Sequence, residues 1–536
     1  MSFKSNNSQQ LSLSDILYNL TEREIKVLEK SWAKPFAEHI FPAIDEKPFA
    51  VLYGKDNSRP NTPVNIIIGA LILKEMLGLT DEEVVESLMF DIRFQYALHT
   101  TSFEEQPLSD RSLSRFRQRC LTYSKTNGVD LMHDCITGLS AEIAAFMKIN
   151  GTMQRMDSAM IESNIRKLSR LELIYTCVAK FMSYLHKQNL DSAEEISDLV
   201  HYIDPGDYNR VIYHNKSIST SERLSIVIAD AAKLMKLFNG NCDDVTEYQL
   251  LVRVLNEQTK LDESGNRCIK TKEDGEMNAS MLQNPADPEA TYRKKAGKEH
   301  RGYVANFTET VGENGSVVTD YQAEQNTYSD SKFLSDAIEK AAKQDGNVTI
   351  VADGAYSSQK LKDAAAEKNI SVHTTDLLGK KTEDINADFE FDNNGTKVTR
   401  CPNGCIPKSC CYVKQSGSCR ISFYKSDCEK CPYFDVCQPK EGKKTYYKFV
   451  SETSAKRAQT QRNMQTEEFK NLARLRNGVE TIPSILRRKF NVDKIPVRGL
   501  DNLRFWLAPK IGALNFKKLF NYISQRGNYA QNPVLA

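Results

Sequence analysis

The sequence lacks an apolar run long enough to cross a membrane. The longest run, residues 64–73, ends at Lys74 and falls short of the ~18 residues that a membrane helix requires. The first ten residues, MSFKSNNSQQ, are polar and contain no signal peptide pattern. We therefore expect a cytoplasmic protein with no membrane partner, in which thiols stay reduced.

The sequence also has almost no net charge, +2 over 536 residues, but the charge is unevenly distributed. Residues 451–536 contain 16 Lys and Arg against 6 Asp and Glu. A basic block of this kind indicates contact with phosphates, although a solvated basic surface would have the same composition. The length predicts about two to four domains, since a single core rarely grows to this size.

Residues 1–150 are predicted to form an all-α domain. Thr80 precedes three acidic residues and is a plausible helix N-cap. The segment LSDRSLSRFRQRC begins another helix, with Ser109 or Asp110 as its cap. This helix carries the arginines Arg111, Arg115, Arg117 and Arg119. Short helices ending in an arginine-rich one are typical of helix-turn-helix DNA readers, and a plain helical bundle fits the same pattern.

The periodicity changes after residue 150. Residues 152–162 are predicted to be a strand that contains Asp157, and residues 165–290 are predicted to be a helical insertion. Two further strands follow, RGYVANFTETV and SVVTDYQAEQ. They are joined by a turn containing Asn314-Gly315, which is a strong hairpin signal.

A strand–helix–strand unit comes next. The strand in NVTIVADGAYSS ends on Asp353, and a helix then leads to a last strand near ISVHTT. Such a unit should pair its strands in parallel, and ligands of such sheets lie beyond the carboxyl ends of the strands. Gly354 would let the chain turn away without a Cβ clash. Alternatively, Asp-Gly is simply a common turn sequence.

The segment EEFKNLARLRNGVETIPSILRRKF is predicted to be one basic helix. On it Arg476, Glu480 and Arg487 would share a face. This arrangement suits a metal-binding acid set beside phosphate-binding cations. It also suits a surface ion-pair ladder of little energetic value.

Taken together, these segments resemble the DDE transposases of bacterial insertion sequences. MDSAMIESNI is similar to their first-Asp motif, KEHRGYVANFTETV to the hairpin that follows, and VTIVADGAYSS to the second-Asp motif. RNGVE followed by Arg487 resembles the signature around the final glutamate. The N-terminal helices resemble the helical domain of the same enzymes.

The resemblance implies an α/β fold with an RNase H-like mixed sheet flanked by helices. It also implies a catalytic triad of Asp157, Asp353 and Glu480. Two Mg²⁺ ions, or Mn²⁺ in their place, would bind these acids and support phosphodiester cleavage and strand transfer. Asp157 would bridge both ions. Glu162 and Asp320 are nearby acids that could be mistaken for members of the triad.

The resemblance further implies DNA as the partner. Double-stranded terminal repeats and target DNA would be bound by a homodimer or larger assembly, associated with the nucleoid. Arg476 and Arg487 would neutralise phosphate near the site, and Arg111, Arg115 and Arg117 would contribute DNA contacts. One branch of the family has a tyrosine where this chain has Ala473, and a lysine is usual where it has Arg487.

Eight of the 13 cysteines fall within residues 401–437. Cys428 and Cys431 have the spacing of a zinc knuckle. The segment CPNGC contains two more candidate thiol ligands, and Cys437 can supply the last ligand. We predict a structural Zn²⁺ held by Cys401, Cys428, Cys431 and Cys437, which is also where similar transposases place their cysteines. Cys405 is the main substitute, and reduced cysteines without metal are the alternative.

The predicted division follows from these segments. Residues 1–150 form the helical DNA-binding domain, and residues 151–164 with 291–380 form the core. The insertions are 165–290 and the Cys-rich 381–450, and residues 451–536 complete the core. Two other functions fit the sequence: a nuclease that cuts without rejoining, and a DNA-binding regulator that has lost turnover.

Overall fold

The computed structural model describes most of the chain in two compact units. The described residues are 1–6, 15–54, 59–191, 194–214, 217–275, 278–295, 297–344, 346–356, 358–375 and 381–526. Met1–Ala337 together with Thr481–Ala536 forms the first unit, and Ile338–Glu480 forms the second. Within these ranges, no helix combines the length and the apolar character needed to cross a bilayer.

The N-terminal part of the first unit is helical, as predicted. Thr80 caps its helix through a reciprocal pair of hydrogen bonds with Glu83, and Ser109 rather than Asp110 caps the arginine-rich helix. The helices are α1 (Glu22–Lys30), α2 (Ala33–Pro35), α3 (Val64–Leu77), α4 (Asp81–Phe90), α5 (Ile92–Ala97), α6 (Asp110–Asn127) and α7 (Leu131–Phe146). Helix α3 is buried along almost its whole length, so the other helices surround it.

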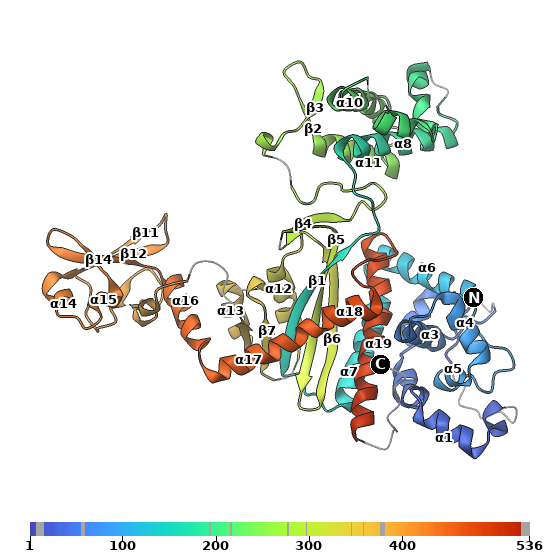
Figure 1. Cartoon of the computed structure of the whole chain (residues 1–536), viewed down its shortest axis with the longest axis horizontal. Helices are drawn as coiled ribbons and strands as arrows, with labels where there is room; N and C mark the ends of the chain where they lie inside the picture. The colour runs from blue at the N-terminus through green and yellow to red at the C-terminus, as the bar shows by residue number, and fades with distance from the viewer. Residues whose placement is uncertain are drawn as a thin grey trace. The chain divides into compact units, whose positions relative to one another are not determined.

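The long C-terminal helix α19 (Leu500–Arg526) packs with these N-terminal helices, running along α3, α7 and strand β6 (Figure 1). The Phe516 ring lies 5.1 Å from that of Phe36 in an edge-to-face contact. The buried Asn515 amide donates to Ser140 Oγ at 2.8 Å and to the Val318 carbonyl at 2.8 Å. Residues more than three hundred positions apart thus share one core.

An antiparallel sheet completes this core. It contains β1 (Met153–Glu162), β4 (Thr291–Lys295), β5 (Lys298–Gly312) and β6 (Gly315–Gln325). β5 pairs with the other three, and the predicted hairpin joins β5 to β6. Gly302 of β5 approaches Ile161 of β1 so closely that a Cβ would lie 2.3 Å from its carbonyl oxygen, which explains the glycine. Helix α12 (Asp330–Ala341) follows these strands.

The predicted helical insertion has its own buried core, centred on residues such as Phe181 and Leu251. Its main helices begin at Ser–Glu capping boxes, Ser169 with Glu172 and Ser219 with Glu222. Its elements are α8 (Arg170–Lys187), η5 (Glu194–Ile203), α9 (Asp207–Asn209), η6 (Arg210–His214), α10 (Thr220–Leu237), α11 (Thr246–Gln258) and a small hairpin of β2 (Thr259–Leu261) and β3 (Arg267–Ile269).

The second unit contains the predicted strand–helix–strand unit. β7 (Val348–Ala352) and β8 (Ile370–Thr374) pair in parallel, and α13 (Gln359–Ala366) connects them. Helices α16 (Glu452–Asn463) and α17 (Glu467–Asn477) follow, and α17 leads into the 3-10 turn η10 (Gly478–Glu480). The basic segment is therefore not one helix, since η10 separates α17 from α18 (Thr481–Phe490), which belongs to the first unit.

The cysteine-rich segment contains a four-stranded sheet that the sequence did not lead us to expect. Its strand order is β11-β12-β14-β13, all antiparallel. The elements of this part are β9 (Glu390–Phe391), β10 (Val398–Arg400), β11 (Ser409–Val413), β12 (Ser418–Tyr424), α14 (Lys425–Glu429), α15 (Phe434–Cys437), β13 (Lys440–Glu441) and β14 (Thr445–Val450). The α/β class is thus confirmed, while the five predicted domain boundaries stay a prediction.

Candidate metal and DNA site

Asp353 lies where predicted, at the carboxyl end of a parallel strand. β7 ends at Ala352, and the Gly354 amide donates to Asp353 Oδ1 at 2.6 Å. Gly354 begins a 3-10 turn, and the Tyr356 amide closes it on the Asp353 carbonyl at 3.0 Å. Gly354 is buried and supports the carboxylate through its N–H, and the steric reason that we gave for the glycine stays a prediction.

Arg476 brings Asp353 and Glu480 to one place in the second unit. Its Nη1 donates to Glu480 Oε1, and its Nη2 lies 3.8 Å from Asp353 Oδ2. The first contact depends on the i,i+4 spacing across the end of α17. The second depends on the packing of α17 against β7. Two of the three predicted carboxylates therefore share one guanidinium.

The burial of this cluster is uneven. The Arg476 side chain is 12% exposed, whereas those of Asp353 and Glu480 are 45% and 57% exposed. The cation is therefore fixed in the protein and the acid oxygens face solvent. Exposed carboxylate oxygens are the donors that Mg²⁺ binds, because this ion keeps several waters and takes few protein ligands. The two carboxylates at this place are of the chemical kind that such an ion binds.

Asp157 lies in the middle of β1 in the first unit, opposite Phe307 of β5. It is partly buried, and its Oδ1 accepts from the Ser158 amide at 2.9 Å. Of the two acids that could be mistaken for it, Asp320 is bound by His133 Nε2 at 3.1 Å. Glu162 ends β1, 51% exposed and 3.7 Å from His300.

The predicted DNA-binding arginines differ in their surroundings. Arg111 and Arg115 are exposed on α6, and Arg487 is exposed in the last turn of α18. Arg117 instead binds Asp81 with both terminal nitrogens, the Nη2–Oδ1 distance being 2.6 Å. The hydrogen bonds from Arg117 lower the pKa of Asp81 to about 2. Arg117 is thus already engaged within the protein.

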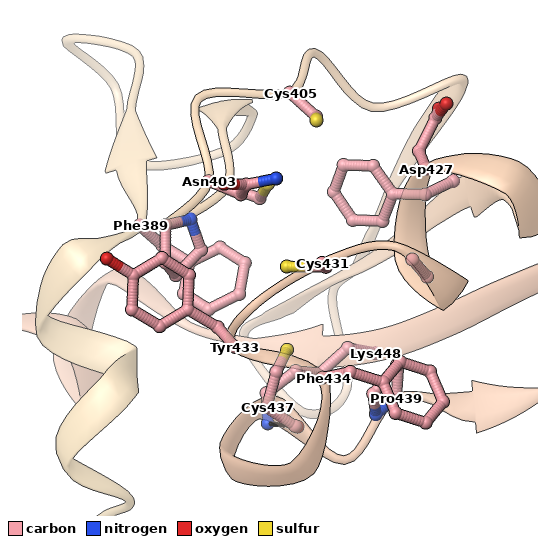
Figure 2. A pocket seen from close by; sticks show the side chains of 14 residues that line it. Phe389, Asn403, Cys405, Asp427, Cys431, Tyr433, Phe434, Cys437, Pro439 and Lys448 are labelled. Carbon is pink, nitrogen blue, oxygen red and sulfur yellow. Dashed lines mark hydrogen bonds between the residues drawn. The ribbon is translucent and has the colours of Figure 1, made fainter.

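Five cysteines line one small cavity of about 30 Å³, together with aromatic rings and Lys448. They are Cys401, Cys405, Cys428, Cys431 and Cys437. Figure 2 shows Cys405, Cys431 and Cys437 around the same space. Burial, followed by the charges of Cys437 and Cys431, raises the pKa of Cys428 to about 11. The predicted ligands and their substitute therefore gather at one place.

The geometry of these thiols is not that of a formed metal site. In the ranges that the structure describes, no group of three or more His, Cys, Asp or Glu side chains is arranged to hold a metal ion. Two cysteines outside this cavity have other contacts. Cys419 donates to the Thr396 carbonyl at 3.1 Å, and Cys410 accepts from the Val398 amide at 3.4 Å. Cys411 is exposed.

Sequence reasoning missed the bridging contact of Arg476, because the distance between α17 and β7 depends on packing. It also did not predict the sheet of the cysteine-rich segment. The alternation of buried Cys419, Ile421 and Phe423 with more exposed residues was a readable strand signal. We interpreted the spacing of the cysteines as a metal site instead.

Two family models match the chain. One described as "Transposase domain (DUF772)" matches residues 26–119, and one described as "Transposase DDE domain" matches residues 400–520. The first match includes the exposed arginines of α6. The second includes Arg476, Glu480 and the cysteine-rich sheet. The resemblance to DDE transposases is therefore confirmed over these residues, and transposases act on DNA.

No curated protein matches the chain. Among solved structures, the piggyBac transposase synaptic complex with hairpin DNA is 8% identical, and the match covers 95% of this chain and 77% of that one. Its TM-score is 0.29, too low to demonstrate a shared fold.

Proposed function

We propose that this protein is an active transposase that binds the ends of its insertion sequence, cleaves the DNA there and joins it to a target. The observation that carries this proposal is the meeting of Asp353 and Glu480 on one buried arginine, with their oxygens facing solvent. A cluster of exposed acids would repel DNA in a protein that only binds it. Such a cluster is useful where metal ions lie between acids and phosphate.

The proposed site consists of Asp157, Asp353 and Glu480 on an RNase H-like core. These acids would hold two Mg²⁺ ions, or Mn²⁺, which activate the attacking oxygen and stabilise the leaving one. Water attacks the phosphodiester first and releases a 3′-OH at the end of the element. That 3′-OH then attacks a target phosphodiester and displaces its 3′ oxygen. Arg476 and Arg487 neutralise phosphate charge beside the reacting group.

DNA binding is assigned to exposed cations outside the acids. Arg111 and Arg115 on α6 contact the phosphates of the terminal repeat. Arg117 supports this helix through Asp81 rather than touching DNA. Because transposition requires two ends held together, the proposed active form is a dimer or larger assembly on DNA.

The direct test is cleavage and joining of a linear DNA carrying the ends of the element, with and without Mg²⁺. Asp353→Ala should lower cleavage at least about 1,000-fold while leaving DNA affinity within about twofold, since barrier losses of about 4 kcal/mol correspond to this factor. Glu468→Gln, which changes an exposed acid on the same helix as Arg476, is the matched control. Cutting by Asp353→Ala would refute the site.

The same assay separates the alternative functions. Cleavage without joining would identify a nuclease, and tight binding without cleavage by the wild type would identify a regulator. Both outcomes contradict the proposal.

We also propose that Cys401, Cys428, Cys431 and Cys437 hold a structural Zn²⁺, with Cys405 as the substitute ligand. The support is their shared cavity and the thiolate chemistry of the donor set. Cys431→Ser should reduce bound zinc from one ion per chain and lower the Tm, because metal binding contributes to folding. Cys411→Ser, at an exposed cysteine outside the cavity, should change neither. Zinc-free wild-type protein would contradict this assignment.

A further inference from the structure

The sheet of the cysteine-rich segment has one buried face and one open face. The buried face carries Cys419, Ile421 and Phe423 of β12 with Val450 of β14. Because side chains alternate along a strand, the residues between them lie on the opposite side. These are Arg420, Ser422, Tyr424, Tyr447 and Phe449, which we call the open face. The register pairs Arg420 with Phe449 and Ser422 with Tyr447.

Two aromatic side chains on the open face are about half exposed. Phe449 is 48% exposed and Tyr424 is 52% exposed. The Tyr447 and Phe449 rings are 6.1 Å apart and nearly perpendicular, so they form one small aromatic cluster. A grouped, exposed apolar surface of this kind marks a binding surface rather than a random surface residue.

Cations flank these rings. The Arg420 guanidinium lies 4.7 Å from the centre of the Tyr447 ring, and Lys408 Nζ lies 4.4 Å from that of Tyr424. Lys440 of β13 pairs with Tyr447 and adds a third positive charge on this side. In the contacts of Arg420 and Lys408 the cation lies over the face of a ring.

Acids are absent from the open face among the residues that the structure describes. Residues 401–450 contain nine Lys and Arg against four Asp and Glu. Asp427 and Glu429 are in α14, and Asp435 is in α15. Glu441 is bound to Lys425. The open face therefore presents positive charge and aromatic rings together, which complements an anionic partner that has planar groups.

We propose that the open face binds single-stranded nucleic acid, with Phe449 and Tyr424 stacking on unpaired bases and Arg420, Lys408 and Lys440 contacting phosphates. Duplex DNA is a poor fit, because its bases are already stacked on one another and a groove admits a helix or a narrow ribbon. Open sheets that expose aromatic rings take splayed bases instead. Strands without partners arise wherever DNA is opened at a cleavage site.

Fluorescence anisotropy of the full chain with a labelled 20-nucleotide thymidine strand tests this proposal. Phe449→Ala and Tyr424→Ala should each weaken binding about 5- to 150-fold, the range observed for losing one stacked base. Affinity for a duplex of the same length should change less than about twofold. Phe449→Tyr should restore binding. Phe90→Ala, which removes an 86% exposed ring in the first unit, is the matched control.

The charge component is tested separately. Arg420→Gln should reduce the slope of log affinity against log salt by about 0.7, the value for one phosphate of a single strand. A uridine RNA strand should bind about as tightly as the thymidine strand, since stacking does not read the 2′-OH. Tighter binding of the RNA strand by the wild type would identify RNA as the ligand, and it would still support single-strand binding at the open face.

Two outcomes overturn the proposal. One is an affinity for the single strand within twofold of wild type in both aromatic variants. The other is an equal loss on duplex and single strand. Photo-crosslinking of a bromouridine-containing strand supplies an independent measurement, because adducts must map to residues 418–424 or 445–450. Binding here requires no cleavage, so Asp353→Ala should bind the strand like the wild type.

Discussion

Two acid–cation clusters in this protein contain the same kinds of residue and differ in whether the acids are buried. Around Arg476 the cation is 12% exposed, and its acids Asp353 and Glu480 are about half exposed. In the first unit the acid Glu309 is completely buried, and its cations Arg155 and Lys518 are 11% and 20% exposed. The first cluster therefore presents acids to solvent, whereas the second is buried on both sides.

The difference indicates different roles. Burial opposes ionisation of Glu309, but the charges of Lys518 and Arg155 and their hydrogen bonds outweigh it and hold the pKa of Glu309 below its usual value. All three partners are satisfied by one another, as a structural element requires. Around Arg476 the acid oxygens are left open to ions and phosphates. The two clusters have the same kinds of residue, so only the burial of their acids distinguishes them.

The largest effect on stability is expected in the buried cluster. Glu309→Gln leaves Arg155 and Lys518 without their anion, so the free energy of unfolding should fall by about 3–5 kcal/mol. Urea denaturation followed by circular dichroism measures this. Glu480→Gln, in the exposed cluster, should change the free energy of unfolding by less than about 1 kcal/mol. Similar losses of unfolding free energy in both variants would contradict the proposed difference between the two clusters.

A smaller effect, on catalysis rather than stability, is expected at Arg476. Arg476→Met should lower the cleavage rate about 100-fold, because the proposed contact of Arg476 with phosphate is lost. Arg474→Met is the matched control, since Arg474 is exposed on the same helix and donates from Nη1 to Asn471 Oδ1. Arg476→Lys should recover part of the cleavage rate, but a lysine should not contact both Asp353 and Glu480 as the guanidinium does. A wild-type rate in Arg476→Met would limit Arg476 to a structural role.

The smallest effect is expected at the Asp81–Arg117 pair, which is intermediate in exposure. The folded pKa of Asp81, about 2, lies below its usual value of 3.8. The pair therefore stabilises the protein above about pH 4, and this stability is lost as the pH falls toward 2. With solvent screening we expect about 1 kcal/mol at pH 7.

Thermal unfolding between pH 7 and pH 2 measures this difference. The gap in Tm between wild type and Asp81→Asn should close as the pH falls, while Glu86→Gln, at an exposed acid on the same helix, should show no such change. A gap that is constant with pH would mean that Asp81 does not act through its charge.

The sequence by itself determined the local elements. Four local features follow from alternation, turn chemistry and capping, which act over a few residues. They are the strand of Asp157, the hairpin at Asn314-Gly315, the parallel unit whose first strand ends next to Asp353, and the cap at Thr80. Motif order predicted the family resemblance in the same way, because it requires only residue identity and sequence.

Only the tertiary structure decided which charges are buried and which contacts join distant segments. The approach of Arg476 to Asp353, the engagement of Arg117 by Asp81 and the packing of α19 with the N-terminal helices each depend on how elements pack. Such packing balances burial, charge and shape over residues that are far apart in the chain, and no short stretch of sequence contains that information.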